Sequence, residues 1–102
     1  MQKREALIKR STLETDIEIY IHLDGQHQIT IDLPIPFFPH LLKSLAFYAN
    51  WDFSIKAHGD VEVDFHHLVE DTGIVLGEAF HAAIGEIKNI NRYSTQFIPM
   101  DE

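Results

Sequence analysis

Two histidine–carboxylate pairs in residues 64–71 carry the clearest chemical potential of this 102-residue chain. On a helix, side chains four residues apart lie on one face, so His66 is expected beside Glu70 and His67 beside Asp71. Each pair offers an imidazole nitrogen and a carboxylate oxygen to a single point in space. Such nitrogen and oxygen donors suit manganese, iron, zinc or nickel better than metals that prefer soft ligands. The spacing therefore indicates a metal-binding helix end.

A structural interpretation of the same carboxylates stays open, because Glu70 and Asp71 would also stabilise the positive end of a helix dipole. Protonated histidines are disfavoured at that end, so two in succession are harder to explain in this way. His40, near the start of an earlier helical pattern, and His58, before a glycine, add modest support for metal binding. The other histidines are interpreted as structural or solvated: His22, His27 and His81.

An anion site is suggested only weakly by Arg92 and Ser94, because one guanidinium and one hydroxyl are little evidence for phosphate binding. Glu14 lies in a connection between two strand patterns, where an isolated acid is typically solvated. The sequence contains no Gly-rich phosphate loop and no Ser-His-Asp arrangement. The residues alone therefore favour metal chemistry over phosphate-loop or serine chemistry.

The first elements predicted along the chain are β-strands. A weak pattern predicts a strand over residues 5–12, and clear alternation of apolar and polar residues predicts strands over residues 16–23, 28–33 and 53–58. Asp24-Gly25 is a strong turn signal, so the second and third of these strands are predicted to form a hairpin. The alternation resumes through Val61, Val63 and Phe65, and residues 92–98 are predicted as a final strand.

Two amphipathic helices are predicted between and after these strands. The first covers residues 39–48, with Pro39 in its first turn. The second is about five turns long, and its predicted buried face is Val69, Gly73, Leu76, Phe80, Ile84 and Ile87. Gly73 and Gly77 weaken a helix, which would be tolerable where another backbone packs closely. These elements predict an α+β fold, a two-layer sandwich whose β-sheet is covered on one face by two helices.

Composition excludes several classes of protein. Eight Lys and Arg against sixteen Asp and Glu give a net charge of −8, which argues against a nucleic-acid binder. No apolar run approaches the ~18–20 residues of a membrane span, and the first residues lack the apolar stretch of a signal peptide. Without cysteine there is no disulfide framework or thiolate site. We expect a cytoplasmic, acidic, single domain over residues 1–102.

Six segments, taken in their order and spacing, resemble the imidazoleglycerol-phosphate dehydratase family over nearly the whole chain. The most specific is the double-histidine segment, and the next is the Phe-Phe-x-His segment. The segments are Ser11-Thr12-Leu13-Glu14-Thr15, Leu23-Asp24-Gly25, Ile35-Pro36-Phe37-Phe38-Pro39-His40-Leu41-Leu42, Gly59-Asp60-Val61, His66-His67-Leu68-Val69-Glu70-Asp71, and Arg92-Tyr93 through Pro99-Met100-Asp101-Glu102.

The resemblance implies a βββαβα-type repeat, of the ribosomal protein S5 domain 2-like kind. The family's subunit contains two such repeats. This chain is similar to the first, over residues 1–89, followed by the opening strand of the second, over residues 90–102.

The resemblance also implies an activity and a site. The activity is metal-assisted elimination of water from imidazole glycerol phosphate in histidine biosynthesis. The implied cofactor is manganese, or another divalent transition metal, bound at a subunit interface. The implied metal ligands are His40, His66, His67 and Glu70; the implied catalytic acid is Glu14; the implied phosphate-binding residues are Arg92 and Ser94.

Five positions depart from the family's pattern. Pro39 and Phe65 stand where the family has aspartates before its histidines, Tyr48 replaces a common histidine, and Asn89 and Asn91 replace a glycine and a basic residue. Carboxylates that orient ligand histidines matter, since losing one typically costs ~10–100-fold in metal affinity or activity. Whether the chain is an active enzyme therefore stays open.

Two functions remain for the chain. One is a half-length dehydratase that self-associates, so that a second copy supplies the missing ligands. The other is a non-catalytic metal-binding or assembly module, such as a fragment, a degenerate paralogue or a reconstructed half. The helical layer carries more apolar surface than one sheet face needs, which predicts a homodimer or larger symmetric assembly through helix-on-helix packing.

Overall fold

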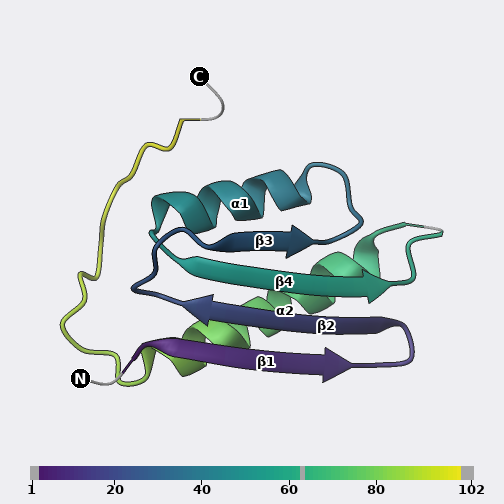
Figure 1. Cartoon of the computed structure of the whole chain (residues 1–102), viewed down its shortest axis with the longest axis horizontal. Helices are drawn as coiled ribbons and strands as arrows, with labels where there is room; N and C mark the ends of the chain where they lie inside the picture. The colour runs from purple at the N-terminus through teal and green to yellow at the C-terminus, as the bar shows by residue number, and fades with distance from the viewer. Residues whose placement is uncertain (1–2, 63, 100–102) are drawn as a thin grey trace.

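Alternating residues build most of a four-stranded sheet in the computed structural model, which describes residues 3–62 and 64–99 (Figure 1). The elements, in chain order, are β1 (Glu5–Ser11), β2 (Thr15–His22), β3 (Ile29–Asp32), α1 (Phe38–Tyr48), β4 (Asp52–Gly59) and α2 (His66–Ile84). The strands lie in the order β1-β2-β4-β3. β1 and β2 are antiparallel, as are β2 and β4, whereas β3 runs parallel to β4.

The predicted hairpin between residues 16–23 and 28–33 is wrong, because β4 lies between β2 and β3. The connection between β2 and β3 is instead hydrogen-bonded to the first residue of β4, Asp52. The Asp52 carboxylate accepts hydrogen bonds from the backbone N–H groups of Gln26 (2.8 Å) and Gln28 (2.9 Å). These two donors lower the pKa of Asp52. A side chain on Gly25 would clash with the backbone of Asp52, so this connection passes close against the start of β4.

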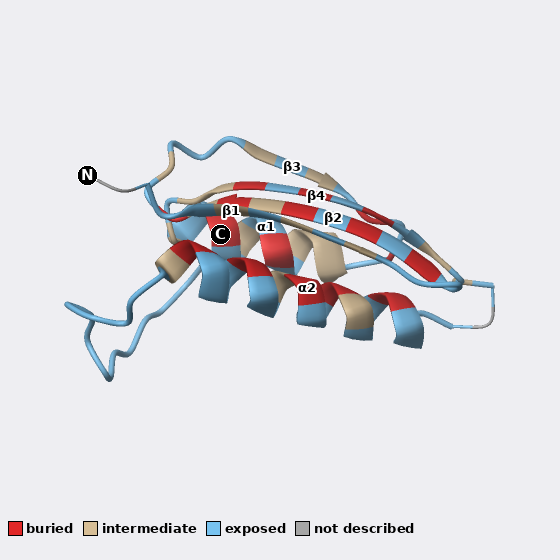
Figure 2. Cartoon of the chain, turned by 90° about the horizontal axis from the view of Figure 1, so that it is seen from below, coloured by how far each residue is buried: buried red, intermediate tan, exposed pale blue. Residues whose placement is uncertain are grey.

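The core lies between one face of the sheet and both helices, which confirms the α+β two-layer sandwich (Figure 2). Alternate residues of the two central strands point into it, as the period of two requires. The buried residues of these elements are Ile17, Ile19 and Ile21 of β2, Phe53, Ile55 and Ala57 of β4, and Leu42 and Ala46 of α1.

The predicted buried face of the long helix is wrong by one residue, although Leu76 and Ile84 of that face are partly buried against the core; Ile87 lies beyond the end of the helix. The residues of α2 that face the sheet are Leu68, Thr72, Val75, Ala79 and Ala83. Val69 and Phe80, which were predicted inside, are 38% and 40% exposed. Small residues at Thr72, Ala79 and Ala83 let α2 approach the sheet closely, and the bulkier stripe is therefore turned outward.

Two predicted strands are not formed. The described residues 61–62 and 64–65 form no strand, and Val63 lies outside the described residues. Residues 92–98 are extended but lie along no strand edge; they leave α2 after Gly85 and travel past α1 (Figure 1). Residues 100–102 of the predicted terminal strand lie outside the described residues. None of the helices in the described ranges is long and apolar enough to cross a membrane.

Candidate metal and proton-transfer site

Glu14 and His67 meet where the β1–β2 turn approaches the first turn of α2. Glu14 Oε2 lies 3.1 Å from His67 Nδ1. The turn is held by Thr12, whose Oγ1 accepts hydrogen bonds from the backbone N–H groups of Glu14 (3.1 Å) and Thr15 (3.0 Å). The Glu14 carbonyl also accepts a hydrogen bond of 3.0 Å from the Asp60 N–H, which ties the turn to the end of β4. Glu14 is therefore held in place by three segments of the chain.

His66 and Glu70 form the predicted pair on α2. His66 Nε2 lies 3.1 Å from Glu70 Oε2, and the backbone N–H of His66 donates to Asp64 Oδ1 at 3.0 Å. The rings of His66 and His67 approach edge to face, with their centroids 5.5 Å apart. Both members of the pair are more than half exposed, so the contact adds little stability but leaves the donor atoms accessible to a ligand.

The predicted pair of His67 and Asp71 is wrong. Asp71 Oδ2 instead accepts a hydrogen bond of 2.6 Å from the buried Thr15 hydroxyl. Asp71 turns toward the sheet because β2 supplies this donor, and His67 turns to the Glu14 carboxylate. The two histidines thus use acids from different elements, which helical spacing alone does not show.

His40 lies apart from these residues. It belongs to the first turn of α1, where its ring packs against Phe37 with centroids 5.8 Å apart. α1 runs beside β3, at the opposite edge of the sheet from β1 (Figure 1). Within residues 3–62 and 64–99, the structure brings together no group of three or more histidine or acidic side chains that could hold a metal ion.

Arg92 and Ser94 also lie away from the histidine pair. Both are exposed in the segment that follows α2. This segment starts at the end of α2 opposite to His66 and His67 (Figure 1). A single copy of the chain, as described, therefore does not bring them to the other candidate site residues.

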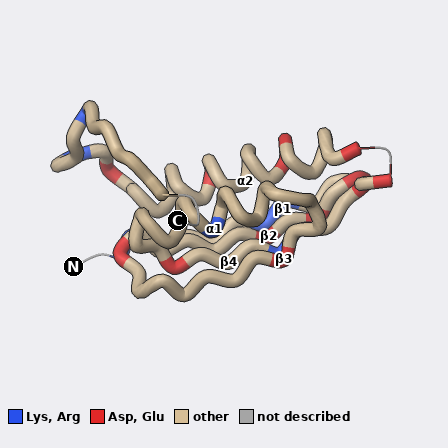
Figure 3. Tube along the Cα trace, turned by 90° about the horizontal axis from the view of Figure 1, so that it is seen from above, with Lys and Arg blue, Asp and Glu red and all other residues tan. Residues whose placement is uncertain are grey.

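An open depression of about 500 Å³ joins the β1–β2 turn to α2. Three of the seven candidate site residues, Glu14, His67 and Glu70, line it, and several acidic positions lie at this end of the molecule (Figure 3). The residues around it are Arg10, Thr12, Leu13, Glu14, His67, Glu70, Asp71 and Ile74. Arg10 was missed by the sequence analysis. The available signal was its place in the alternation of β1, where Ala6, Ile8 and Arg10 share the half-buried face.

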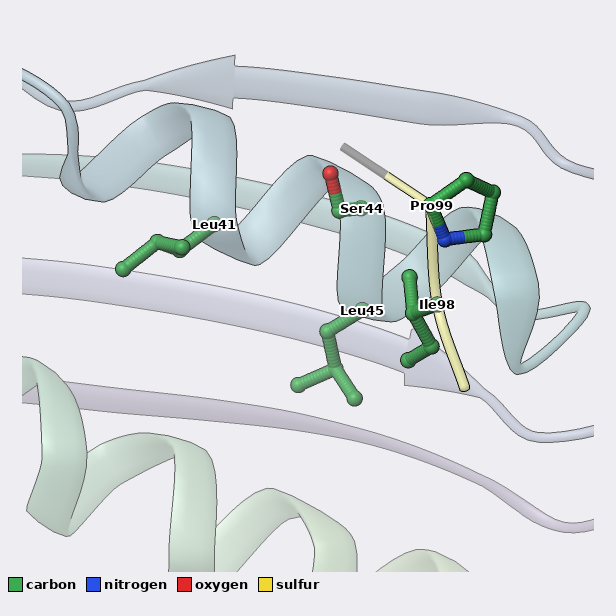
Figure 4. Close-up of a pocket in the computed structure, with 5 residues that line it drawn as sticks. All are labelled: Leu41, Ser44, Leu45, Ile98 and Pro99. Carbon is green, nitrogen blue, oxygen red and sulfur yellow. The ribbon is translucent and has the colours of Figure 1, made fainter. Parts of the chain in front are cut away.

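A second hollow, of about 230 Å³, lies between α1 and the end of the described chain (Figure 4). It is lined by Leu41, Ser44, Leu45, Ile98 and Pro99. None of these side chains titrates or is a usual metal ligand. The depression beside α2 is therefore the better candidate for metal binding and proton transfer.

Imidazole nitrogens and carboxylate oxygens are the donors that this depression offers. His67 and Glu14 both line it and form one such pair, whereas of the pair His66 and Glu70 only Glu70 lines it. Donors of this kind suit a divalent transition metal, which usually takes four or more ligands, so neither pair is a complete ligand set. A carboxylate such as that of Glu14 can also accept or donate a proton.

Known proteins match this chain along its whole length. Residues 34–102 match the family described as Imidazoleglycerol-phosphate dehydratase. The imidazoleglycerol-phosphate dehydratase of Clostridium acetobutylicum is 50% identical over 101 residues, which cover 99% of this chain and 51% of the relative. That of Dictyoglomus thermophilum is 52% identical over 99 residues, which cover 97% of this chain and 53% of the relative.

A third relative shows the same relation. The imidazoleglycerol-phosphate dehydratase of Alcanivorax borkumensis is 47% identical over 102 residues, which cover all of this chain and 50% of the relative. The chain thus spans about half the length of the curated relatives it matches. The family match and these identities lead to one conclusion: the chain belongs to the imidazoleglycerol-phosphate dehydratase family.

Proposed function

We propose that the chain acts as a self-associating half-length dehydratase, which eliminates water from imidazole glycerol phosphate in histidine biosynthesis. The observation that carries the proposal is the contact between Glu14 and His67 in a chain of this family. It joins an acid suited to proton transfer to a donor suited to a metal, although the two residues are 53 positions apart. The acidic, water-accessible depression around them fits a small polar substrate better than a macromolecule.

Manganese, or another divalent transition metal, is the proposed cofactor. His66, His67 and Glu70 would hold it, and their nitrogen and oxygen donors fit such an ion. Because His40 lies at the other edge of the sheet, we expect it to serve the site of a second copy. When bound, the metal would polarise the imidazole of the substrate and favour charge build-up on that ring.

Glu14 is the proposed catalytic acid and base. The reaction takes a proton from a carbon and returns one to a departing hydroxyl, and a positioned carboxylate is suited to move either proton. His67 Nδ1, 3.1 Å from the carboxylate, holds Glu14 in one orientation. Three hydrogen bonds of the β1–β2 turn fix the backbone around Glu14 at the edge of the depression.

Self-association would complete the site. The relatives are about twice as long as this chain, so a second copy is proposed to take the place of their other half. The outward stripe of α2 suits such a contact, because Val69 and Phe80 are 38% and 40% exposed. Beside them, a Cβ atom added to Gly73 or Gly77 would meet nothing within 4 Å. Another helix can approach α2 closely there.

Turnover by the purified chain tests the proposal. With Mn²⁺ and imidazole glycerol phosphate we expect formation of the keto product, and Glu14→Gln should lower kcat by about 10²–10⁴-fold. Glu18→Gln is the matched control, since Glu18 is an exposed acid on the outer face of β2 and should leave kcat unchanged.

Metal binding is measured separately, by calorimetry with Mn²⁺. His66→Ala should weaken Mn²⁺ binding and abolish turnover together. A folded, Mn²⁺-loaded chain without turnover would reject the dehydratase and leave the non-catalytic metal-binding or assembly module as the function.

A further inference from the structure

Strand β1 lies at one edge of the sheet, and within the described residues β2 is its one strand partner (Figure 1). Two hydrogen bonds just beyond the ends of the β1–β2 ladder show which backbone groups are used. The Thr12 N–H donates to the Thr15 carbonyl at 2.8 Å, and the Leu23 N–H donates to the Arg4 carbonyl at 2.9 Å. Both pairs continue the register of the ladder, in which bonded and non-bonded pairs alternate, so the even-numbered residues of β1 bond to β2. The backbone groups of the odd-numbered residues therefore point to the open edge: Glu5, Leu7, Lys9 and Ser11.

The sequence of β1 is self-complementary about Leu7. Antiparallel pairing of two copies of this strand, centred on Leu7, would place each Glu5 opposite Lys9 of the other copy. This register joins odd-numbered residues to odd-numbered residues, so it uses the backbone groups that β2 leaves free. On the inner face it sets Ala6 beside Ile8 of the other copy, and both residues are apolar and only partly buried against the core. Leu7, which is 53% exposed, would meet its own copy.

The charged side chains of β1 already lie in rows across the outer face of the sheet. The Tyr20 hydroxyl donates to Glu5 Oε2 at 2.6 Å, and Lys9 Nζ lies 3.7 Å from Glu18 Oε2. The Lys9 side chain is nevertheless 68% exposed, so it can also reach a second acid. Edge pairing would join the two rows, with Glu5 of one copy between Tyr20 and the other copy's Lys9. Opposite charges that face each other across strands are favourable, whereas like charges are not.

One like-charge contact belongs to the same register, since Arg10 would lie opposite Arg4 of the other copy. Arg4 is already neutralised, because its guanidinium donates to both carboxylate oxygens of Asp24, at 2.9 Å and 2.6 Å. The repulsion at this position is therefore small beside the two Glu5–Lys9 pairs.

The other edge of the sheet is less suited to such pairing. β3 has four residues, against seven in β1. Pro34 and Pro36 follow it, and proline has no N–H to donate to a ladder. A long ladder between copies is therefore available at β1 and not at β3.

We propose that copies of this chain join edge to edge through β1, so that two sheets continue into one another about a twofold axis at Leu7. The proposal rests on the proposed self-association, because it joins pairs of copies that are already packed through their helices. One ladder between two short strands is marginal alone. A helix-packed pair presents two β1 edges, so that two ladders can form together and support each other. The closed form is a dihedral assembly of two helix-packed pairs.

Amide hydrogen exchange distinguishes the β1 contact from helix packing. The full ¹⁵N-labelled chain is followed by NMR at protein concentrations below and above assembly, without metal or substrate. The amides of Glu5, Leu7 and Lys9 should exchange at least about 5-fold more slowly in the assembly, the factor that one net hydrogen bond provides. Those of Ala6 and Ile8 should be protected at both concentrations, because they bond to β2. Helix packing alone would leave the three odd-numbered amides fast.

Two charge reversals test the register by sedimentation. Lys9→Glu makes both members of each facing pair acidic, and Glu5→Lys makes both basic, so each variant alone should form the β1 contact about 10-fold more weakly. An equimolar mixture of the two variants should recover it, because the facing charges are opposite again. Lys56→Glu is the matched control: it makes the same charge change at an exposed position of β4, away from the edge, and should assemble as the unmodified chain does.

Three results would overturn the proposal. An assembled chain whose Glu5, Leu7 and Lys9 amides stay fast would reject the edge contact and leave helix packing intact. Protection of these amides that does not depend on protein concentration would assign the edge to another segment of the same chain. A mixture of the reversed variants that assembles no better than either alone would reject the register. None of these readouts uses turnover, so a failed dehydratase assay is a separate outcome.

Discussion

Single hydroxyl groups connect the sheet to the candidate site. Thr15 is buried, and its Oγ1 both donates to Asp71 Oδ2 at 2.6 Å and lies 3.1 Å from Thr12 Oγ1. Through these contacts one residue joins the β1–β2 turn, the start of β2 and the first turns of α2. The positions of Glu14 and His67 relative to each other therefore depend on Thr15.

Replacing Thr15 by valine keeps the side-chain shape and removes the hydroxyl. Asp71 then loses a charge-assisted hydrogen bond, and we expect the free energy of unfolding to fall by about 1–3 kcal/mol. Chemical denaturation measures this change. Thr30→Val on β3 is the control, because Thr30 is exposed and should change stability by less than about 0.5 kcal/mol. Equal effects in the two variants would contradict the role of the Thr15–Asp71 bond.

Tyr20 supplies a pH-dependent prediction. Its hydroxyl donates to Glu5 Oε2 at 2.6 Å, and this hydrogen bond is the main cause that raises the pKa of Tyr20 from 10.0 to about 12. A pKa raised by folding stabilises the folded state below pH 10.0, and this contribution is lost as the pH rises from 10.0 to about 12. A ¹³C NMR titration of the Tyr20 ring measures the pKa.

Glu5→Gln is the matched variant for that titration. It removes the negative charge that favours the protonated phenol, so the pKa of Tyr20 should fall toward 10.0. A Tyr20 pKa that is the same in both proteins would show that Glu5 is not its cause.

Helix α2 carries two adjacent apolar stripes, one that packs against the sheet and one that is partly exposed. Its sheet-facing stripe is built from small and medium residues that bring the helix close to β1 and β2. The next stripe is apolar and includes Val69 and Phe80, which are 38% and 40% exposed; the Phe80 ring centroid lies 6.0 Å from that of Trp51. One stripe therefore serves the fold, and the other is available to a partner.

Two valine truncations on α2 distinguish these stripes. Val75→Ala removes buried methyl groups, and we expect it to lower the free energy of unfolding by about 2 kcal/mol. Val69→Ala, at a side chain 38% exposed, should cost less than about 1 kcal/mol in dilute solution. Urea denaturation at low protein concentration compares the two. The reverse order of costs would restore the buried face that the sequence predicted.

The whole molecule leaves much of the outer side of its helix layer exposed, although Ile98 and Pro99 share a hollow with Leu41 and Leu45 of α1. The large apolar side chains of this surface are between 38% and 43% exposed: Leu41, Leu45, Val69, Ile74 and Phe80. Apolar surface of this kind, contributed by two helices, is typical of a protein interface. In the proposed assembly it faces the same surface of a second copy, as twofold symmetry requires.

Gly77 tests this assembly without disturbing the single chain. A Cβ atom there meets nothing within 4 Å, so Gly77→Ala should raise the free energy of unfolding by up to about 1 kcal/mol. Gly77→Phe should also fold, but its ring would hold a second helix away. We expect sedimentation to show an assembly for the unmodified chain and a monomer for Gly77→Phe. An unmodified chain that is monomeric at micromolar concentration would refute self-association.

Local periodicity was enough to predict most elements and part of the site. The alternation of Ile17, Ile19 and Ile21 and the three-to-four spacing of the helices depend only on neighbours along the chain, and both gave the correct element types. The pair His66–Glu70 was predictable for the same reason, since both residues lie on one helix four positions apart.

Contacts between distant segments were decided only by the tertiary structure. Alternation says that β2 and β3 are strands, but it does not say that β4 lies between them, because any free strand edge can accept a partner. The α2 sequence is apolar on two adjacent stripes, and packing against the sheet selects the one with small residues. Glu14 meets His67, and Arg10 lines the same depression, because the β1–β2 turn folds over the start of α2. Spacing within one element contains no information about such a meeting.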